Sequence, residues 1–401
     1  MWLLSHILQK ELIKIKEEVM RKSVDLRIAA VLLGALILML LPTMVQGQTK
    51  APVKIGVILP MTGPAALFGE QTNRGVQMAA KLINNAGGIL GGRLVKIYLE
   101  DDQANPVEGV NAVKKLMNRE GTKLITGGVN SSVSLAELQV TKEAGLLHLV
   151  TVSTAPAIRE QGHPSLFALQ PTNTMKDDFA LPWIAQNLKP PKVVVLAENT
   201  DYGRVELDEL KKNWGNSGPK IIATEIFQLG ESDFTINLNK FKAMKPDLFY
   251  IATAAPNTLG AILKQAYEIG FKTPIFLAPG NLNMDVIRLA GPAIEGIMCA
   301  DYYVNILDTP ANKKFVKDYE EMYKKPPEKM EMLGYESITI LSGAINKCGT
   351  DTDVKKISDT LRENKWPSPR GEIVFDQKGQ AKGVTKDQVL YVKDGKIALR
   401  K

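Results

Sequence analysis

Apolar and polar positions follow two alternating periods along most of this chain. Residues 53–59 form a predominantly apolar run of strand length, rich in β-branched side chains. Residues 70–85 instead place Val76, Ala79 and Ile83 at helical spacing, on one face of a helix. The sequence therefore predicts a strand, a loop rich in proline and glycine, and a helix, in that order.

The same order repeats along the rest of the chain. A second strand is expected at residues 94–99, and Asn105 and Pro106 then supply the capping side chain and first-turn proline of a helix. Residues 170–172 interrupt the pattern near the middle, and residues 394–395 are typical of a hairpin turn. Further strands are expected near Leu124, Leu146, Lys192, Ile221, Leu248, Ile275 and Gly296. Strands that alternate with helices predict an α/β fold with parallel sheets.

The N-terminal region has the pattern of a secretory signal peptide. Basic residues precede an apolar run over residues 28–41, and small or modest residues follow up to Gly47. We expect cleavage after Gly47, so that residues 1–47 are removed and the mature chain is periplasmic or otherwise extracytoplasmic. A membrane anchor is the weaker alternative, because the run is about six residues shorter than a membrane span requires. Translation from Met20 instead of Met1 is a second open alternative.

Composition narrows the class of protein. The composition, 45% hydrophobic and 23% charged, is that of an ordinary globular protein. The length of 401 residues exceeds what one hydrophobic core usually serves, so two domains are predicted. Its 50 basic and 43 acidic residues are interspersed, without the basic stripe or tail that nucleic-acid binding requires. Cys299 and Cys348 are too few for a disulfide scaffold and lack the spacing of a zinc site. Their pairing stays open, and no metal or other cofactor is expected.

Two segments between a strand and a helix are candidates for ligand binding. Ligands of open parallel sheets bind at the carboxyl ends of the strands, where helix N-termini present free N–H groups and suit an anion such as a carboxylate. Residues 127–132 (Gly-Gly-Val-Asn-Ser-Ser) and residues 152–156 (Val-Ser-Thr-Ala-Pro) offer amides and hydroxyls at such positions. The alternative is that these hydroxyls only cap helices.

Short motifs in a fixed order give the chain a family resemblance. They include Met61-Thr62-Gly63-Pro64, residues 83–89 (Ile-Asn-Asn-Ala-Gly-Gly-Ile), Asp101-Asp102-Gln103, Asp201-Tyr202-Gly203, Lys245-Pro246-Asp247 and Glu295-Gly296. In these motifs the chain resembles the type I periplasmic binding proteins of the Leu/Ile/Val-binding kind, the substrate-binding subunits of ABC importers. The resemblance implies two Rossmann-like α/β lobes with parallel-sheet cores, joined by three hinge crossovers. Lobe 1 would hold residues 53–172 and 302–382, and lobe 2 residues 173–301 and 383–401.

The same resemblance assigns roles to individual residues. Ser131, Ser153 and Thr154 match lobe 1 positions that hold the ligand carboxylate, in agreement with the helix-terminus argument. Phe68 falls where family members place an aromatic ring against the ligand side chain. Tyr202 matches a lobe 2 tyrosine that reaches across the cleft on closure, and a tyrosine packed at a helix start is the alternative.

Departures from the family pattern concern the ligand. Pro279 stands where amino-acid binders carry an acid that faces the ligand ammonium, and Ala254 or Ala255 replaces a second aromatic. A buried ammonium without an anionic partner costs several kcal/mol, so the missing acid favours a ligand without an α-amino group. A branched or aromatic carboxylate of this kind therefore competes with the branched-chain amino acids. Asn257, Asn281 or Asn283 could supply a polar contact. The lobe 1 disulfide of the family is missing, since its positions match Ala104 and Asn130.

The predicted function is therefore that of a non-enzymatic, extracytoplasmic binding protein, which closes over a small-molecule ligand and delivers it to an ABC permease in the membrane. One alternative is a binding protein that reports ligand occupancy to a membrane receptor. An exported hydrolase is the other, and the sequence gives it little support. Beyond the signal only His148 and His163 remain, for which core or loop roles are expected, and there is no Gly-x-Ser-x-Gly motif. No nucleotide-binding motif of the Walker type is present either.

Overall fold

A computed structural model describes residues 2–40, 50–215, 218–383 and 388–400. The chain divides into two compact units, residues 1–49 and residues 50–401. In the first unit, α1 (Trp2–Leu40) is one continuous helix, which contains most of the predicted apolar run. The predicted cleavage site after Gly47 lies outside the described residues. Within the described ranges, no helix combines the length and the apolar character that crossing a bilayer requires.

The second unit begins with a five-stranded sheet of order β2-β1-β3-β4-β5, in which all neighbouring strands are parallel. Its strands are β1 (Val53–Leu59), β2 (Val95–Asp101), β3 (Leu124–Gly127), β4 (Leu147–Val150) and β5 (Leu166–Ala168). The helices between them are α2 (Ala66–Asn85), α3 (Pro106–Lys115), which continues as the π-helical turn Leu116–Glu120, α4 (Ser131–Glu143) and the 3-10 helix Pro156–Glu160. Asn105 caps α3 as predicted, because its side chain accepts from the Val107 N–H at 2.8 Å. Helix α2 begins four residues before the predicted start, at an N-cap without a side-chain hydrogen bond.

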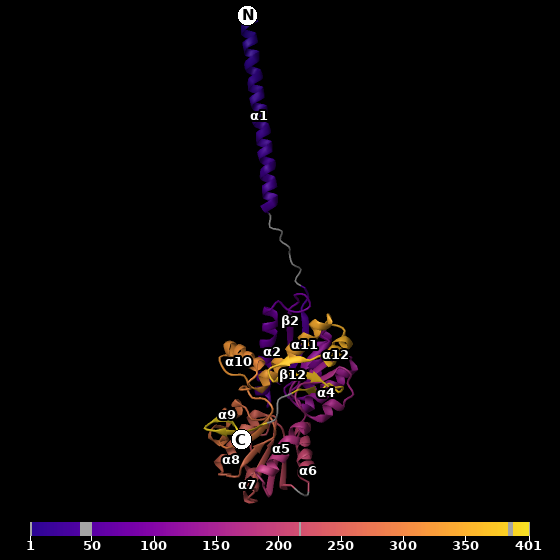
Figure 1. Cartoon of the computed structure of the whole chain (residues 1–401), viewed down its shortest axis with the longest axis vertical. Coiled ribbons are helices and arrows are strands. Elements are labelled where there is room, and N and C mark those ends of the chain that lie inside the picture. Colours follow the sequence, from indigo (N-terminus) through magenta and orange to yellow (C-terminus); the bar gives the residue numbers. More distant parts are fainter. Residues whose placement is uncertain (1, 41–49, 216–217, 384–387, 401) are drawn as a thin grey trace. The chain divides into compact units, whose positions relative to one another are not determined.

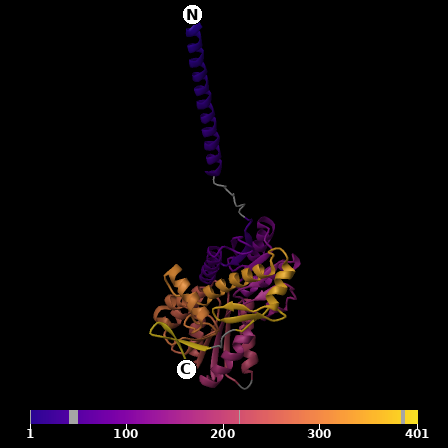
Figure 2. The ribbon, with the colours of Figure 1, turned by 45° about the horizontal axis from the view of Figure 1, so that its top comes forward.

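A second group of helices covers this sheet. It consists of α10 (Pro310–Tyr323), α11 (Lys329–Cys348) and α12 (Val354–Glu363), followed by a small sheet of β11 (Trp366–Ser368), β12 (Gly371–Phe375) and β13 (Ala381–Lys382). Helices α2 and α11 lie side by side (Figures 1 and 2). They approach closely at Gly75 and Gly334, where an added Cβ would lie about 2 Å from the carbonyl oxygens of Glu331 and Thr72 respectively. Glycine at both positions therefore allows the two backbones to touch.

The other sheet has seven strands in the order β15-β14-β10-β9-β8-β6-β7. Strands β6 (Lys192–Glu198), β7 (Lys220–Phe227), β8 (Leu248–Ala252), β9 (Ile275–Leu277) and β10 (Met298–Asp301) are parallel. Strands β14 (Gln388–Lys393) and β15 (Lys396–Leu399) add an antiparallel hairpin, whose turn residues Asp394 and Gly395 both have positive φ, as the predicted Asp-Gly turn requires. Figure 1 shows helices α5 (Asn173–Asn187), α6 (Asp201–Trp214), α7 (Thr235–Ala243), α8 (Pro256–Glu268) and α9 (Met284–Ala290) in this half.

The chain passes between the two sheets three times: after β5, after β10, and between β13 and β14. Buried charged groups hold the first two passages. Arg370 pairs with Glu336 at 2.9 Å and donates to the Leu169 carbonyl at 2.8 Å, and Lys329 pairs with Asp301 at 2.7 Å. The strands of the five-stranded and the small sheet fall within the residues expected for lobe 1, and those of the seven-stranded sheet within lobe 2. The lobe boundaries themselves stay a prediction.

Both cysteines, together with His148 and His163, lie inside the protein. Cys299 and Cys348 are both free and buried. His148 lies in β4, fully buried, and burial lowers its pKa to about 3, so that it stays neutral near pH 7. The Thr141 hydroxyl lies 3.3 Å from a ring nitrogen of both His148 and His163. The two histidines therefore sit in one buried hydrogen-bonded group, of the kind expected for core residues.

Candidate functional site

The carboxyl-end loops of the two parallel sheets face each other, and hydrogen bonds join the two halves around them. The Ser132 hydroxyl accepts from the Asp201 N–H at 3.0 Å, which links the N-termini of α4 and α6. On the other side, the Gln71 amide of α2 donates to Asp285 at 2.8 Å. The Glu328 carboxylate, at the start of α11, accepts from the Met284 N–H at 2.7 Å. We call the facing loops the loop interface: residues 127–132 and 152–156 on one side, and residues 199–202, 253–256 and 278–283 on the other.

Ser131 connects the two segments that the sequence singled out. It is the first residue of α4 and is buried. Its hydroxyl oxygen accepts from the N–H groups of Thr154 at 3.3 Å and Ala155 at 3.2 Å. The sharp path from β3 into this position needs Gly127, which has a φ of 126° and leaves no room for a Cβ, since that atom would lie 2.0 Å from the Ile58 carbonyl oxygen. Local backbone geometry thus delivers a hydroxyl to the amides of the neighbouring loop.

Ser153 and Thr154 are also buried, but their contacts differ. The Ser153 hydroxyl lies 2.8 Å from the Ser134 hydroxyl, so it is engaged within the same side of the loop interface. The Thr154 carbonyl accepts from the Asn173 N–H at 3.0 Å, at the start of α5. The structure therefore brings Ser131 and the Thr154 backbone together and directs the Ser153 hydroxyl toward α4.

Asn130 is a residue whose role the sequence did not indicate. It occupies the N-cap of α4 and is only 4% exposed, yet its side chain does not cap the helix. Among the described residues, neither its Nδ2 nor its Oδ1 has a hydrogen-bond partner. Buried amides are rarely left unsatisfied, so this side chain offers both a donor and an acceptor to a ligand. Asparagine is also an ordinary N-cap residue, and so no sequence signal distinguishes this use.

Tyr202 lies in the half that contains the seven-stranded sheet, at the start of helix α6. It is the second residue of α6, and its hydroxyl accepts from the Asn281 amide at 2.6 Å. Burial raises the pKa of Tyr202 well above its usual range, so the phenol stays neutral. Of the other asparagines considered, Asn283 caps α9 by accepting from the Val286 N–H at 2.8 Å, and Asn257 is exposed. Asn281 is therefore the asparagine that joins the predicted tyrosine.

The remaining predicted positions are spread along the interface. The Ala254 N–H donates to the Glu198 carboxylate at 2.8 Å, and Ala255 is buried at the N-cap of α8. Pro279 is buried after β9 and accepts a hydrogen bond through its carbonyl. Phe68 is 2% exposed in the first turns of α2 and belongs to the hydrophobic core under the five-stranded sheet.

Two buried cations flank these loops, and the sequence analysis named neither. Arg159 donates to the carbonyls of Ser153 at 3.3 Å and Gln170 at 2.8 Å, and burial lowers its pKa to about 9, so it remains charged at neutral pH. Lys176 donates to the Pro279 carbonyl at 2.9 Å. Burial lowers the pKa of Lys176, and the Glu206 carboxylate opposes this shift. In the sequence both cations stand beside acidic residues, in a pattern that is typical of a solvated helix surface.

The arrangement is suited to binding an anion. Backbone N–H groups at the start of α4, the Arg159 charge and the unpartnered Asn130 amide all lie on one side of the loop interface. Within the described ranges, no three His, Cys, Asp or Glu side chains are grouped to hold a metal ion.

Two α/β halves, joined by three passages of chain and facing each other through carboxyl-end loops, define the architecture of a two-lobed binding protein. Residues 52–396 match the family model described as periplasmic binding protein. Because this match covers most of the chain, the protein belongs to that family, with the type I fold that its motifs indicated.

Individual relatives agree with this assignment. The chain is 29% identical over 330 residues to the leucine-, isoleucine-, valine-, threonine- and alanine-binding protein of Pseudomonas aeruginosa, covering 82% of this chain and 87% of that one. The structure is similar to the leucine-binding protein LivK of Thermotoga maritima, with a TM-score of 0.80 and 27% identity, over 87% of this chain and 98% of that one. The fold also matches an ABC-transporter solute-binding protein of R. palustris in complex with benzoate, with a TM-score of 0.81, 23% identity, and coverage of 87% and 95%.

Proposed function

We propose that this chain is the extracytoplasmic solute-binding subunit of an ABC importer and that it encloses a small carboxylate in the loop interface. The observation that carries the proposal is the Ser131 hydroxyl, which gathers the Thr154 and Ala155 amides beside the N-terminus of α4. A hydroxyl that accepts two N–H groups still has its own hydrogen to donate, so Ser131 can bind an anion while it orders the neighbouring loop.

Charge and unsatisfied polar groups support a carboxylate in this place. The N-terminus of α4 carries about half a positive charge, and Arg159 adds a full charge behind the Ser153 loop. The Asn130 amide is buried and has no partner among the described residues, so a ligand carboxylate would satisfy its Nδ2. Ser153 would act indirectly by holding Ser134, and Phe68 and Tyr202 would line the apolar and polar flanks of the ligand.

The ligand proposed first is a carboxylate without an α-amino group, with a branched or aromatic body. Pro279 has no carboxylate that could bind a ligand ammonium. Its backbone carbonyl already accepts a hydrogen bond from the Lys176 ammonium. A second cation buried beside Lys176 would be repelled, whereas an uncharged ligand body would not. Ala254 and Ala255 leave room for that body. The benzoate bound by the R. palustris protein is a ligand of this class.

A branched-chain amino acid is the second candidate, and Glu198 is the observation in its favour. This carboxylate is 1% exposed at the end of β6, next to the Ala254 loop. It already accepts from the hydroxyls of Thr200 and Thr253, each at 2.7 Å, and from the Ala254 N–H. Since a carboxylate has about four acceptor positions, one remains for a ligand ammonium.

Closure of the two lobes around the ligand would be the step that allows the permease to recognise the loaded protein. The Ser132 contact with α6 and the contact between Tyr202 and Asn281 both lie at the loop interface, so a ligand that bridges the loops favours the closed orientation. The permease would then read the relative orientation of the two lobes. A cleaved N-terminal segment of residues 1–47 would place the chain on the outer side of the membrane, where the permease takes up its ligand.

Calorimetric titration of the mature chain tests the proposal. Benzoate, 4-methylpentanoate and leucine are compared for the wild type, for Ser131→Ala, and for the exposed control Ser232→Ala. Loss of a charge-assisted hydrogen bond should weaken carboxylate binding by about 10- to 100-fold in Ser131→Ala and leave it unchanged in the control. Binding of 4-methylpentanoate but not leucine selects the first ligand class, and the reverse selects the amino acid. If simple amides bind and none of the three carboxylates does, the anion site is wrong.

A further inference from the structure

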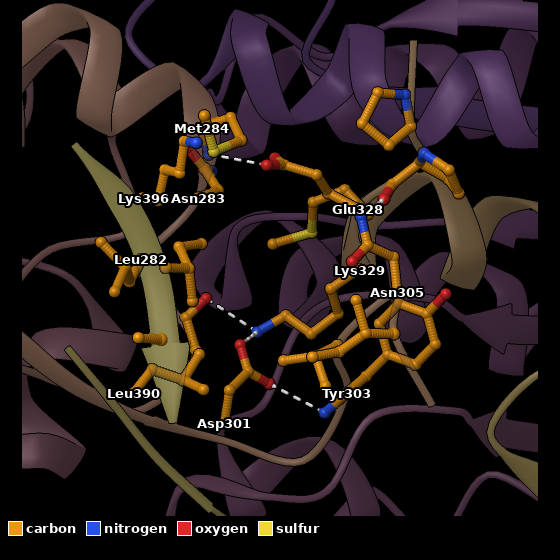
Figure 3. A pocket seen from close by; sticks show the side chains of 18 of the residues that line it. Leu282, Asn283, Met284, Asp301, Tyr303, Asn305, Glu328, Lys329, Leu390 and Lys396 are labelled. Carbon is orange, nitrogen blue, oxygen red and sulfur yellow. Dashed lines mark hydrogen bonds and ion pairs between the residues drawn. The ribbon is translucent and has the colours of Figure 1, made fainter. Parts of the chain in front are cut away.

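A cavity of about 250 Å³ lies beside the second passage between the sheets, and Gly280, Leu282 and Asn283 of the loop interface are among the residues that line it. It is shown in Figure 3, and we call it the hinge pocket. Five segments form its walls: Gln71 of α2, the loop at residues 280–284, the passage at residues 301–306, the start of α11 at residues 326–330, and the C-terminal hairpin. Its volume is just below the range of roughly 300–1,000 Å³ that is usual for drug-sized ligands, and so it suits a smaller molecule.

The lining of the hinge pocket is mostly apolar. Leu282, Met330 and Leu390 line it and are each buried. Figure 3 shows Leu282 and Leu390 on the side of the pocket opposite Lys329. At its rim, Met284 is 45% exposed, Ile306 is 74% exposed and Leu399 is 43% exposed. Large apolar side chains gathered around an open cavity are unusual on a soluble protein and are typical of binding sites.

The charged groups in the interior of the pocket already have polar partners, and the exposed Lys396 lies at its rim. Lys329 donates to the Gly280 carbonyl and to Asp301, each at 2.7 Å (Figure 3). The other oxygen of Asp301 accepts from the Tyr302 N–H at 2.8 Å and from the Tyr303 N–H at 3.4 Å. Glu328 accepts from the Met284 N–H at 2.7 Å. An ionic group in the interior would have to displace one of these partners, so the interior favours an uncharged molecule.

Gln71 provides the remaining polar function. Its Nε2 donates to Asp285 at 2.8 Å and to Glu328 at 3.3 Å, and these two carboxylates fix which end of the amide is the nitrogen. Its Oε1 is therefore a defined acceptor, and this atom is buried and has no partner within the described part of the chain. Since Gln71 is only 2% exposed, bulk water does not readily satisfy this oxygen.

We propose that the hinge pocket is a second binding site, for a small uncharged molecule with an apolar body and one hydrogen-bond donor, such as an aliphatic alcohol or a primary amide. The apolar body fills the space between Leu282, Met330 and Leu390, and the donor binds Oε1 of Gln71. The assignment does not depend on the anion-binding groups proposed above, because Asn130, Ser131 and Arg159 do not line the hinge pocket.

Methionine methyl resonances test this site directly. The probes are 1-hexanol and its isomer methyl pentyl ether, which has the same atoms but no donor. Both are titrated into the mature chain labelled with ¹³C at methionine methyl groups. We expect saturable shifts at Met284 and Met330, which line the pocket, and none at Met244, which does not. Since a neutral hydrogen bond contributes about 0.5–1.5 kcal/mol, the alcohol should bind about 2- to 10-fold more tightly than the ether.

Two variants and a control locate the effect. Gln71→Met should remove the preference for the alcohol and retain binding of the ether. Ile306→Trp places a bulky ring at the exposed rim and should abolish both shifts, whereas Ile236→Trp, at a position 84% exposed on α7, should not. The proposal is overturned if Met284 and Met330 show no saturable shift, if alcohol and ether bind equally to the wild type, or if the shifts persist in Ile306→Trp.

Discussion

Asp102 should make the stability of this protein fall as the pH rises from about 5 to 8. The side chain is fully buried after β2, where Oδ1 accepts from the Ala104 N–H at 2.8 Å and Oδ2 has no partner among the described residues. Burial, aided by the charge of Asp101, raises the pKa of Asp102 from 3.8 to about 7. The nearby buried Glu137 is shifted in the same direction by burial and by Asp102.

The magnitude follows from proton linkage. A carboxyl whose pKa is about 7 when folded and 3.8 when unfolded binds its proton more tightly in the folded state. Its contribution is fully present below the unfolded pKa and is lost as the pH rises through the folded one. Between pH 5 and pH 8 the loss is about 2.5 kcal/mol, since one pKa unit corresponds to about 1.4 kcal/mol. Asp102→Asn imitates the protonated side chain at every pH and should remove this dependence.

Urea denaturation at pH 5 and pH 8 measures the effect. From pH 5 to pH 8 the urea midpoint of the wild type should fall by about 0.8 M more than that of Asp102→Asn. This figure assumes that the free energy of unfolding changes by about 3 kcal/mol per M of urea. Asp101→Asn is a comparison variant, which should lower the midpoint at both pH values because both lie above the unfolded pKa of 3.8. Burial tends to raise the pKa of Asp101, but hydrogen bonds from Thr62, Gln103 and Met61 prevail and lower it, so this carboxylate stabilises the fold above its unfolded pKa. Parallel pH profiles for Asp102→Asn and the wild type would refute the reasoning.

Two further predictions concern packing at the core of the first half. Glu336→Gln leaves the buried Arg370 without its anionic partner and should lower the free energy of unfolding, measured by urea denaturation, by about 3–5 kcal/mol. The control Asp359→Asn removes an exposed ion pair and should leave the midpoint unchanged. Equal effects of the two substitutions would contradict a buried ion pair. Gly334→Ala places a Cβ 2.0 Å from the Thr72 carbonyl oxygen, so it should lower the free energy of unfolding by about 1–3 kcal/mol in the same assay. An unchanged midpoint would mean that α2 and α11 can separate without cost.

Parts of the candidate site could be predicted from the sequence because their signals are local. A glycine pair, a strand end and a run of hydroxyls identified residues 127–132, and the structure joins Ser131 to the backbone of the second predicted loop. Other members could not be recognised. Lys176 and Arg159 stand among charged neighbours in the sequence, and their burial depends on segments more than a hundred residues away, at Pro279 and Gln380.

The sequence by itself determined the order of strands and helices, the Asn105 cap and the Asp394-Gly395 turn. These features depend on backbone geometry and hydrogen bonds within a few residues, so neighbouring side chains are enough to specify them. The tertiary structure decided which polar groups are buried, which remain without partners, and that five distant segments enclose the hinge pocket. Burial and desolvation are set by long-range packing. For this reason the Asn130 amide and the Gln71 Oε1, both without a partner among the described residues, and the shifted pKa of Asp102 appear only in the folded chain.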